Sequence, residues 1–241
     1  MSPDQIPLEL ITNGASHLGP ASADLLAEAK DDPLVLDELL EPLTRYSLIR
    51  RDVDAHSYSI HRLVQEVVKD ELDAATSRLW AERAVRMVDA SFPFDEVAPW
   101  PQSQRYLPHA LLCATAIAYE NMQFVEAGNL LDSVGVYFSN RGQYHEAEPL
   151  YQCALAIHER VLGPEHPDTA NSLNNLALLY HDQGKYEQAE PLVQRALAIH
   201  ERVLSPEHPD TAAILNNLAL LYHDQGKYEQ AEPLYHCAHV A

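Results

Sequence analysis

The sequence has little positive charge and no long apolar run, and each shortage excludes a class of protein. Sixteen Lys and Arg residues stand against thirty-six Asp and Glu residues, which gives a formal net charge of −20 at pH 7. Such a surface repels phosphate backbones and anionic lipid, so neither nucleic acid nor a membrane surface is an expected partner. No stretch reaches the ~18 apolar residues that a membrane span needs, and the N-terminus lacks the pattern of a secretory signal.

Cysteine is also scarce, with Cys113, Cys153 and Cys237 alone. Three cysteines cannot pair completely, and none has metal-ligand spacing, which favours a reducing compartment and a cytoplasmic location. The histidines form no HExxH pair and no Cys/His cluster, so we expect solvated or helix-capping histidines and no metal. The sequence also has no glycine-rich phosphate loop and no evident nucleophile–base arrangement. We therefore expect no cofactor, and an enzyme is the least supported class.

One segment, in contrast, is present twice. LNNLALLYHDQGKYEQAEPL covers residues 173–192 and again residues 215–234. Aligning residues 144–185 with residues 186–227 gives 35 identities in 42 positions, and a third copy opens at Tyr228. A fixed period of this length is typical of a solenoid, in which neighbouring units build one continuous core.

Each unit is predicted to be a helical hairpin. Each of the two helices carries one apolar stripe at helical spacing. In the unit that contains Leu173, Gly184 ends the first helix. The first helix carries Leu173, Leu176, Ala177 and Tyr180, and the second carries Tyr186, Ala189, Val193, Ala196 and Leu197. The two PEHPD segments, at 164–168 and 206–210, separate the units because proline cannot lie inside a continuing helix. We expect helix N-caps at Asp168 and Asp210.

These stripes resemble the tetratricopeptide repeat, at Leu176, Ala177, Tyr180, Ala189, Val193 and Ala196. The segments LNNLALLY, QGKYEQAEPLY and LGPEHPDTA are similar to the kinesin-light-chain type of that repeat over residues 125–241. The resemblance implies stacked hairpins whose first helices line a concave groove, with asparagines that hold cargo peptides. Residues 125–138 resemble a degenerate first helix of the same kind.

The stripe opposite the buried one is polar and recurs in both copies. Asparagine is a poor residue for a helix interior because its side chain competes for backbone hydrogen bonds, so the repeated pair needs a reason. One interpretation is a groove that hydrogen-bonds the backbone of an extended peptide. The alternatives are a ladder of asparagines between adjacent repeats and simple inheritance through recent duplication. The predicted peptide-binding residues are Asn171, Asn174, Asn175, Leu178, His181, Asn216, Asn217, Leu220 and His223.

Residues 33–72 have a different pattern. Four leucines from Leu36 to Leu43 mark a helix, and apolar residues from Leu63 to Leu72 mark another. Between them, SLIRR and SYSI flank the polar turn DVDAH and predict a short antiparallel hairpin. Helix, hairpin and helix give the outline of a winged helix. A DNA reader of this kind needs a basic recognition helix, whereas RLVQEVVKDEL is acidic overall.

The segment YSLIRR…YSIHRLVQEVVKDEL is similar to the winged helix of STAND-class NTPases of the NB-ARC type. In that family a Met-His-Asp triplet opens the last helix and its histidine contacts the ADP phosphates. Ile60, His61 and Arg62 occupy those positions here. The resemblance implies a nucleotide contact for His61 only together with a nucleotide-binding core, whose P-loop is missing from this chain. The alternative for His61 is a helix-start histidine bonded to the hairpin backbone.

We therefore predict a mainly α protein in three parts. These are a winged-helix module over residues 1–75, a helical connector over 76–123, and an α-solenoid of about 2.5–3 repeats over 124–241, the last truncated. The predicted function is a protein-interaction scaffold or sensor, the regulatory part of a STAND NTPase that lacks its own nucleotide-binding core. The alternative is a freestanding adaptor like a kinesin light chain. A protein or peptide ligand is the expected partner, and His239 in place of an inward leucine predicts self-association or a truncated gene product.

Overall fold

The computed structural model describes residues 5–19, 23, 26, 33–92 and 100–240. The chain divides into two compact units, Met1–Met122 and Gln123–Ala241. The mainly helical architecture expected from the sequence is confirmed in both units, and the α-solenoid is confirmed in the second.

The first unit combines helices with one small sheet. Strand β1 pairs with β3, and β3 pairs with β2, so that the order is β1-β3-β2 and both pairings are antiparallel. The described elements are β1 (Ile6–Pro7), α1 (Leu8–Asn13), the 3₁₀ helix η1 (Ala15–Leu18), α3 (Pro33–Arg45), β2 (Ile49–Asp52), β3 (Ser57–Ile60), α4 (Arg62–Glu71), α5 (Ala74–Asp89) and α6 (Trp100–Tyr119).

The predicted helix–hairpin–helix segment is present as α3, β2, β3 and α4, with the turn at residues 53–56. Its packing centres on Leu36 of α3 and Tyr58 of β3, both almost fully buried. The Tyr58 hydroxyl donates a hydrogen bond to Asp37, which also forms an ion pair with Arg51. Helix α4, in contrast, contains no buried residue.

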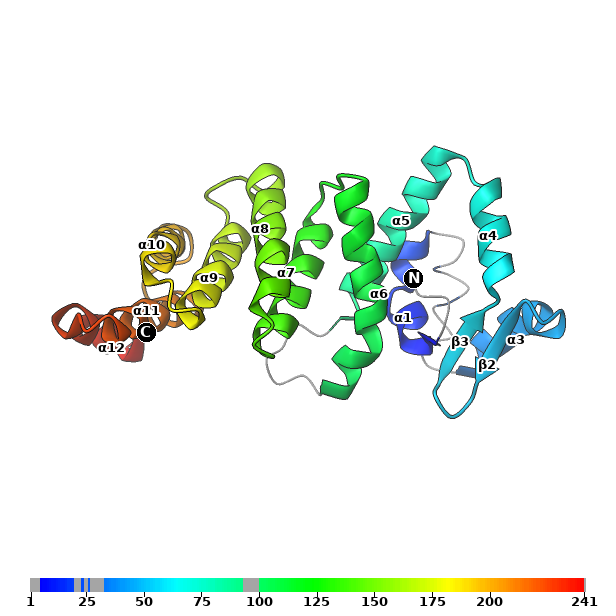
Figure 1. Cartoon of the computed structure of the whole chain (residues 1–241), viewed down its shortest axis with the longest axis horizontal. Helices are drawn as coiled ribbons and strands as arrows, with labels where there is room; N and C mark the ends of the chain where they lie inside the picture. Colours follow the sequence, from blue (N-terminus) through cyan, green and yellow to red (C-terminus); the bar gives the residue numbers. More distant parts are fainter. Residues whose placement is uncertain (1–4, 20–22, 24–25, 27–32, 93–99, 241) are drawn as a thin grey trace. The chain divides into compact units, whose positions relative to one another are not determined.

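The second unit consists of three successive helix pairs (Figure 1). They are α7 (Val125–Ser139) with α8 (Tyr144–Val161), α9 (Pro167–Asp182) with α10 (Tyr186–Val203), and α11 (Pro209–Asp224) with α12 (Tyr228–Val240). Helix α9 packs against α10 of its own pair and against α8 of the preceding pair, and α11 packs in the same way against α12 and α10. The predicted stripe of α9 lies inside this packing, with Leu173 fully buried.

The turns between paired helices follow from their glycines. Gly142, Gly184 and Gly226 have φ values of 70°, 72° and 75°, a region that side chains with a Cβ rarely adopt. In each turn the residue after the glycine donates its backbone N–H to a carbonyl near the end of the first helix, as Lys185 does to Tyr180 at 2.8 Å. Such a bond satisfies a helix-end carbonyl, so the turn closes the helix and reverses the chain.

The predicted N-caps are wrong by two residues. Helices α9 and α11 begin at the second proline of each PEHPD segment, where a missing N–H costs nothing. The caps are His166 and His208, whose Nδ1 atoms accept from the backbone N–H groups of Asp168 and Asp210 at 3.1 and 3.2 Å. Both aspartates lie in the first helical turn, where the helix dipole favours negative charge.

Candidate functional site

The predicted peptide-binding residues lie along α9 and α11 with different exposure. The exposed ones are Asn171, Asn216, Leu220 and His223, and the half-buried ones are Asn174, Asn175, Leu178, His181 and Asn217. The half-buried residues Asn174, Leu178, His181 and Asn217 line a narrow cleft between the two helices. Its volume of about 10 Å³ has room for about one water molecule. A ligand would therefore lie over this cleft rather than fill it.

The asparagines connect neighbouring repeats. Asn217 Nδ2 donates to Asn174 Oδ1 at 3.0 Å, across one repeat. One repeat earlier, Asn175 hydrogen-bonds Asp132, which stands 42 residues before Asn174 and so at the same place in its unit. These bonds match the ladder interpretation. They use one atom of each linked amide, and the amide of Asn216 lies exposed beside them.

A second inter-repeat link follows at the ends of α9 and α11. His181 Nε2 lies 2.9 Å from Asp224 Oδ2, and His223 Nδ1 lies 3.1 Å from Asp224 Oδ1. The hydrogen bond with His223, followed by the bond with His181, holds the pKa of Asp224 below its usual range. Asp224 therefore stays ionised beside the two predicted groove histidines.

Glutamates of the second helices form a third periodic contact. Glu190 of α10 accepts hydrogen bonds from Lys227 Nζ at 2.9 Å and from Tyr222 Oη at 3.4 Å. Glu148 of α8, 42 residues earlier, accepts from Tyr180 Oη at 3.1 Å. The hydrogen bond from Lys227 is the main reason that the pKa of Glu190 lies below its ordinary value. These contacts join each unit to the next and keep the polar stripes in register.

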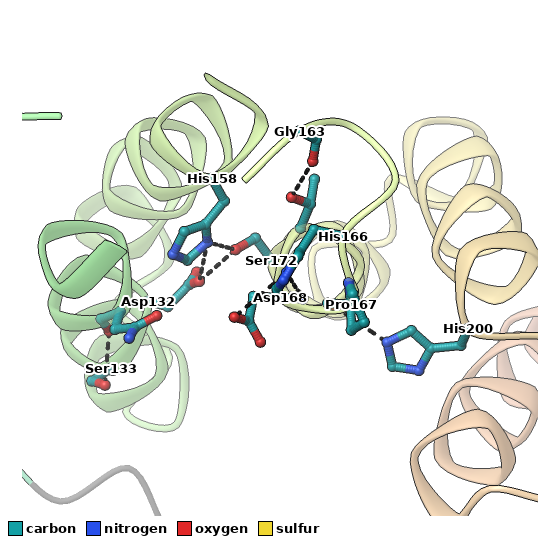
Figure 2. Close-up of polar contacts among 11 residues, drawn as sticks. Asp132, Ser133, His158, Gly163, His166, Pro167, Asp168, Ser172 and His200 are labelled. Carbon is teal, nitrogen blue, oxygen red and sulfur yellow. Dashed lines mark hydrogen bonds and ion pairs between the residues drawn. The ribbon is translucent and has the colours of Figure 1, made fainter. Parts of the chain in front are cut away.

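A buried polar cluster joins α7, α8 and α9 (Figure 2). Ser172 Oγ donates to Asp132 Oδ2 at 2.5 Å, and His158 Nδ1 lies 2.8 Å from Ser172 Oγ. The three residues are 0%, 4% and 1% exposed, in the order Ser172, Asp132 and His158. The expectation of solvated or capping histidines is therefore wrong for His158. It is also wrong for His200, which occupies the same place in the next repeat and is fully buried.

The three residue types of this cluster also occur in serine hydrolases, but their order differs. In a hydrolase the histidine stands between serine and aspartate, and the serine oxygen faces the substrate. Here Ser172 stands between the other two, and His158 Nδ1 is 3.7 Å from Asp132 Oδ2. With all three side chains buried, no substrate reaches the hydroxyl. The cluster therefore stabilises the repeat joint and lacks the geometry of an acyl-transfer site.

Burial shifts the protonation of this cluster in two directions. Burial raises the pKa of Asp132 to about 7, against the opposing effect of hydrogen bonds with Ser172 and Asn175. Burial lowers the pKa of His158, and the backbone of Val125 partly opposes that change. Both shifts have the same cause, because a charge inside a helix joint loses its hydration.

The structure places His61 at the start of α4, on the rim of a cavity of about 610 Å³ that also includes Arg50, Arg51 and Arg62. The His61 backbone N–H donates to the Leu48 carbonyl at 3.1 Å, and its Nδ1 accepts from the Leu63 N–H at 3.3 Å. These two bonds match the alternative interpretation of His61, in which it is a histidine at the start of a helix that is bonded to the hairpin backbone. A nucleotide contact through His61 stays a prediction that depends on a nucleotide-binding core.

Metal centres and membrane spans are the remaining classes of site. Within residues 5–19, 23, 26, 33–92 and 100–240, no three His, Cys, Asp or Glu side chains gather as a metal would require. Across the same part of the chain, none of the helices combines the length and the apolar character of a membrane span.

Two family models match the chain. The model described as Tetratricopeptide repeat matches residues 126–199 and 173–239. The model described as Domain of unknown function (DUF7779) matches residues 1–77. The first match covers the helix pairs of the second unit, and the second covers the helix–hairpin–helix segment.

A curated relative and several solved structures are similar to the chain. The relative, from Hyaloscypha variabilis, is described as a nucleotide-binding leucine-rich repeat (NLR)-like protein and is 37% identical over 128 residues. That match spans 53% of this chain and 13% of the relative, so the chain covers a small part of that protein.

Among solved structures, BtubC (BKLC) from P. vanneervenii has a TM-score of 0.58 and 18% identity over 95% of this chain and 89% of its own. The nearly identical TPR-like repeats of a kinesin light chain candidate from Podosopora anserina have a TM-score of 0.55 and 18% identity. That match covers 97% of this chain and 95% of the other. At this identity both structures show a shared fold.

Proposed function

We propose that this chain, a tetratricopeptide-repeat protein of the NLR/STAND type, is a protein-interaction module that binds an extended peptide or partner surface along α9 and α11. The observation that carries the proposal is the periodic polar face of these two helices. Exposed Asn171 and Asn216 lie beside half-buried Asn174 and Asn217, whose amides are held in place by the bond between them. Amides that are fixed in this way lose little conformational freedom when a ligand binds.

The chemistry of this face suits a peptide backbone. Each asparagine amide offers both a donor and an acceptor, as each peptide unit does. In this bond Asn217 donates and Asn174 accepts, so both N–H groups of Asn174 and the oxygen of Asn217 remain for a ligand. Leu220, which is exposed on α11, adds apolar contact beside the polar groups.

The first unit supports a regulatory role within a longer protein. Leu63, Val67 and Val68 of α4 are 50–69% exposed, which is unusual for three neighbouring apolar side chains on one helix. A nucleotide-binding core packed against this winged-helix segment would cover them. In that arrangement the chain supplies the regulatory and sensing parts of a cytoplasmic switch protein.

A freestanding adaptor is the second candidate. It is favoured by the solved structures, which match this chain over 89–95% of their own length. Coding sequence with GxxxxGK[ST] directly upstream distinguishes the two candidates, because the switch requires a P-loop and the adaptor does not.

Binding is tested with peptides selected by display on the full-length chain and measured by fluorescence anisotropy. The test variant is Asn171→Ala with Asn216→Ala, because both side chains are exposed and their loss leaves the core intact. The control is Gln188→Ala with Gln230→Ala, two exposed residues 42 positions apart on α10 and α12. Losing two hydrogen bonds predicts about a tenfold weaker Kd for the test variant and no change for the control. Equal affinity of both variants for every selected peptide would refute the groove.

A further inference from the structure

The Asp132–Ser172–His158 cluster distinguishes the first repeat joint from the second. At the second joint the corresponding residues, 42 positions later, are Asn174, Ile214 and His200. His200 has no hydroxyl to bond there, and its Nε2 lies 3.3 Å from the Pro167 carbonyl. His158 and His200 are therefore buried at equivalent positions of their repeats. His158 has a carboxylate and a hydroxyl beside it, whereas the corresponding residues beside His200 have neither group.

Helix α7 is shaped to admit the His158 ring. A Cβ at Gly128 would lie 2.3 Å from His158 Nε2 and 2.6 Å from its Cδ2. The corresponding residue at the second joint, facing the His200 side, is Ala170. The ring of His158 thus approaches the preceding helix more closely than an alanine would permit. A glycine inside a helix costs about 1 kcal/mol relative to alanine, so the approach needs a compensating interaction.

The net charge of the cluster is zero when it holds one proton that Asp132 and His158 share. With this one proton, Ser172 hydrogen-bonds both Asp132 and His158. Either the carboxylate accepts from Ser172 while a charged imidazole donates to Ser172, or a neutral carboxyl donates to Ser172 while Ser172 donates to a neutral imidazole. Both arrangements have zero net charge. Removing the proton leaves a buried negative charge, and adding a second leaves a buried positive one.

Few other charges act on this pair. Asp168, at the start of α9, raises the pKa of both Asp132 and His158, and His166, just before α9, lowers that of His158. On α8, Glu159 adjoins His158 in sequence but forms an ion pair with Arg195 at 2.7 Å. The proton therefore belongs to the pair as a unit, as it does for two strongly coupled groups.

We propose that Asp132, Ser172 and His158 form a proton-linked latch, which with one shared proton holds α9 against α7 and α8 and which loosens this joint when the proton is lost to water as pH rises through neutrality. The latch requires neither the groove nor any ligand. Asn175, a predicted groove residue, hydrogen-bonds the same carboxylate, so the latch and the groove share one side of α9.

The direction in which pH changes the stability of the joint follows from the pKa shifts of Asp132 and His158. The raised pKa of Asp132 gives stability that is full below its ordinary 3.8 and lost as pH rises to about 7. The lowered pKa of His158 gives stability that is full above its ordinary 6.5 and lost as pH falls through the shifted value. Because the two groups share one proton, the joint is held most firmly in mildly acidic solution and weakens as pH rises through neutrality.

Hydrogen exchange of the full-length chain tests the latch, with α11 as internal reference for α9. Between about pH 6 and about pH 8.5, after correction for intrinsic exchange, protection of the α9 amides is expected to fall about two- to threefold relative to α11, because the loss of the shared proton in the closed joint is partly offset by the loss of the ordinary His158 proton in the opened one. Asp132→Asn, which introduces the residue found at the second joint, should remove this difference. His200→Asn is the matched control: it removes the contact with Pro167 at the start of α9 but leaves the cluster intact, so the pH dependence of α9 protection should remain that of the wild type.

Parallel pH profiles for α9 and α11 in the wild type would overturn the latch, as would an unchanged profile in Asp132→Asn. A direct measurement covers the case in which a variant does not fold. The carboxyl carbon of Asp132, followed by ¹³C NMR in the wild-type chain, should titrate near neutral pH. Titration in the ordinary acidic range of an aspartate would also overturn the proposal.

Discussion

Ser205→Gly is expected to stabilise the protein, because a glycine already occupies the same place one repeat earlier. Ser205 follows α10 with φ = 120°, and Gly163 follows α8 with φ = 98°. Both are held by equivalent bonds, from Thr211 Oγ1 to the Ser205 carbonyl and from Thr169 Oγ1 to the Gly163 carbonyl, each 2.8 Å long. The backbone geometry thus recurs, while one of the two residues has a Cβ that disfavours it.

The magnitude follows from two opposing effects. A non-glycine residue in this region of φ lowers the free energy of unfolding by about 1–3 kcal/mol. Glycine removes this strain, but its greater freedom in the unfolded chain offsets about 0.4–1 kcal/mol of the gain. A Cβ at Gly163 would meet no atom within 4 Å, so steric contact adds nothing and the strain lies in the backbone. The net expectation is a gain of about 1 kcal/mol for Ser205→Gly and a loss of about the same size for Gly163→Ser.

Urea unfolding of the full-length chain, followed by far-UV circular dichroism, measures both changes. A change of 1 kcal/mol moves the midpoint by about 0.3–1 M urea, in opposite directions for the two variants. The double exchange should return close to the wild-type midpoint, because distant sites are additive within about 0.5 kcal/mol. A destabilised Ser205→Gly, or a Gly163→Ser with an unchanged midpoint, would refute the reasoning.

Two further predictions concern the repeat joints. Gly128→Ala should lower the free energy of unfolding by about 1–2 kcal/mol, because overpacking against the His158 ring outweighs the gain in helix propensity; a higher urea midpoint would contradict it. Ala170→Gly, at the corresponding and fully buried position, measures the loss of helix propensity together with the loss of a buried methyl group. Glu190→Gln should cost about 0.5–1 kcal/mol at neutral pH, because it removes the charge paired with Lys227. Since the pKa of Glu190 is lowered, this contribution is present above its ordinary 4.5 and lost as pH falls further, so thermal melts of variant and wild type should converge in acid.

The sequence predicted the repeat architecture because the same side chains recur at helical spacing. Leu173 and Tyr180 are buried as their stripe requires, and Gly184 has the positive φ of a helix-ending turn. Strand β1 was not predicted, since two residues, Ile6 and Pro7, are too few to show alternation. The N-caps were misplaced because an imidazole acceptor at His166 was not weighed against the more usual aspartate.

Only part of the candidate site could be predicted. The asparagine ladder was open as an alternative, and the Asn217–Asn174 bond matches it, whereas peptide binding stays a prediction. The buried cluster could not be predicted from spacing, since His158 and Ser172 are 14 residues apart and Asp132 is 40 residues from Ser172. Its signal in the sequence is a set of departures from the repeat, in which Asp132 and Ser172 differ from the corresponding residues of the next copy.

The α9–α10 and α11–α12 hairpins are nearly identical, so their side chains alone barely determine which of them stacks on the preceding pair. Ser172 removes this ambiguity. The α7–α8 pair could accept either of two neighbours that agree at most positions, and an exchange would place Ile214 of α11 where Ser172 now stands. The Asp132 carboxylate would then face a hydrocarbon side chain inside the joint, a mismatch worth several kcal/mol. The Ser172 hydroxyl therefore distinguishes the α9–α10 hairpin from the α11–α12 hairpin. A chain built from nearly identical hairpins needs such a difference in order to stack them in one order.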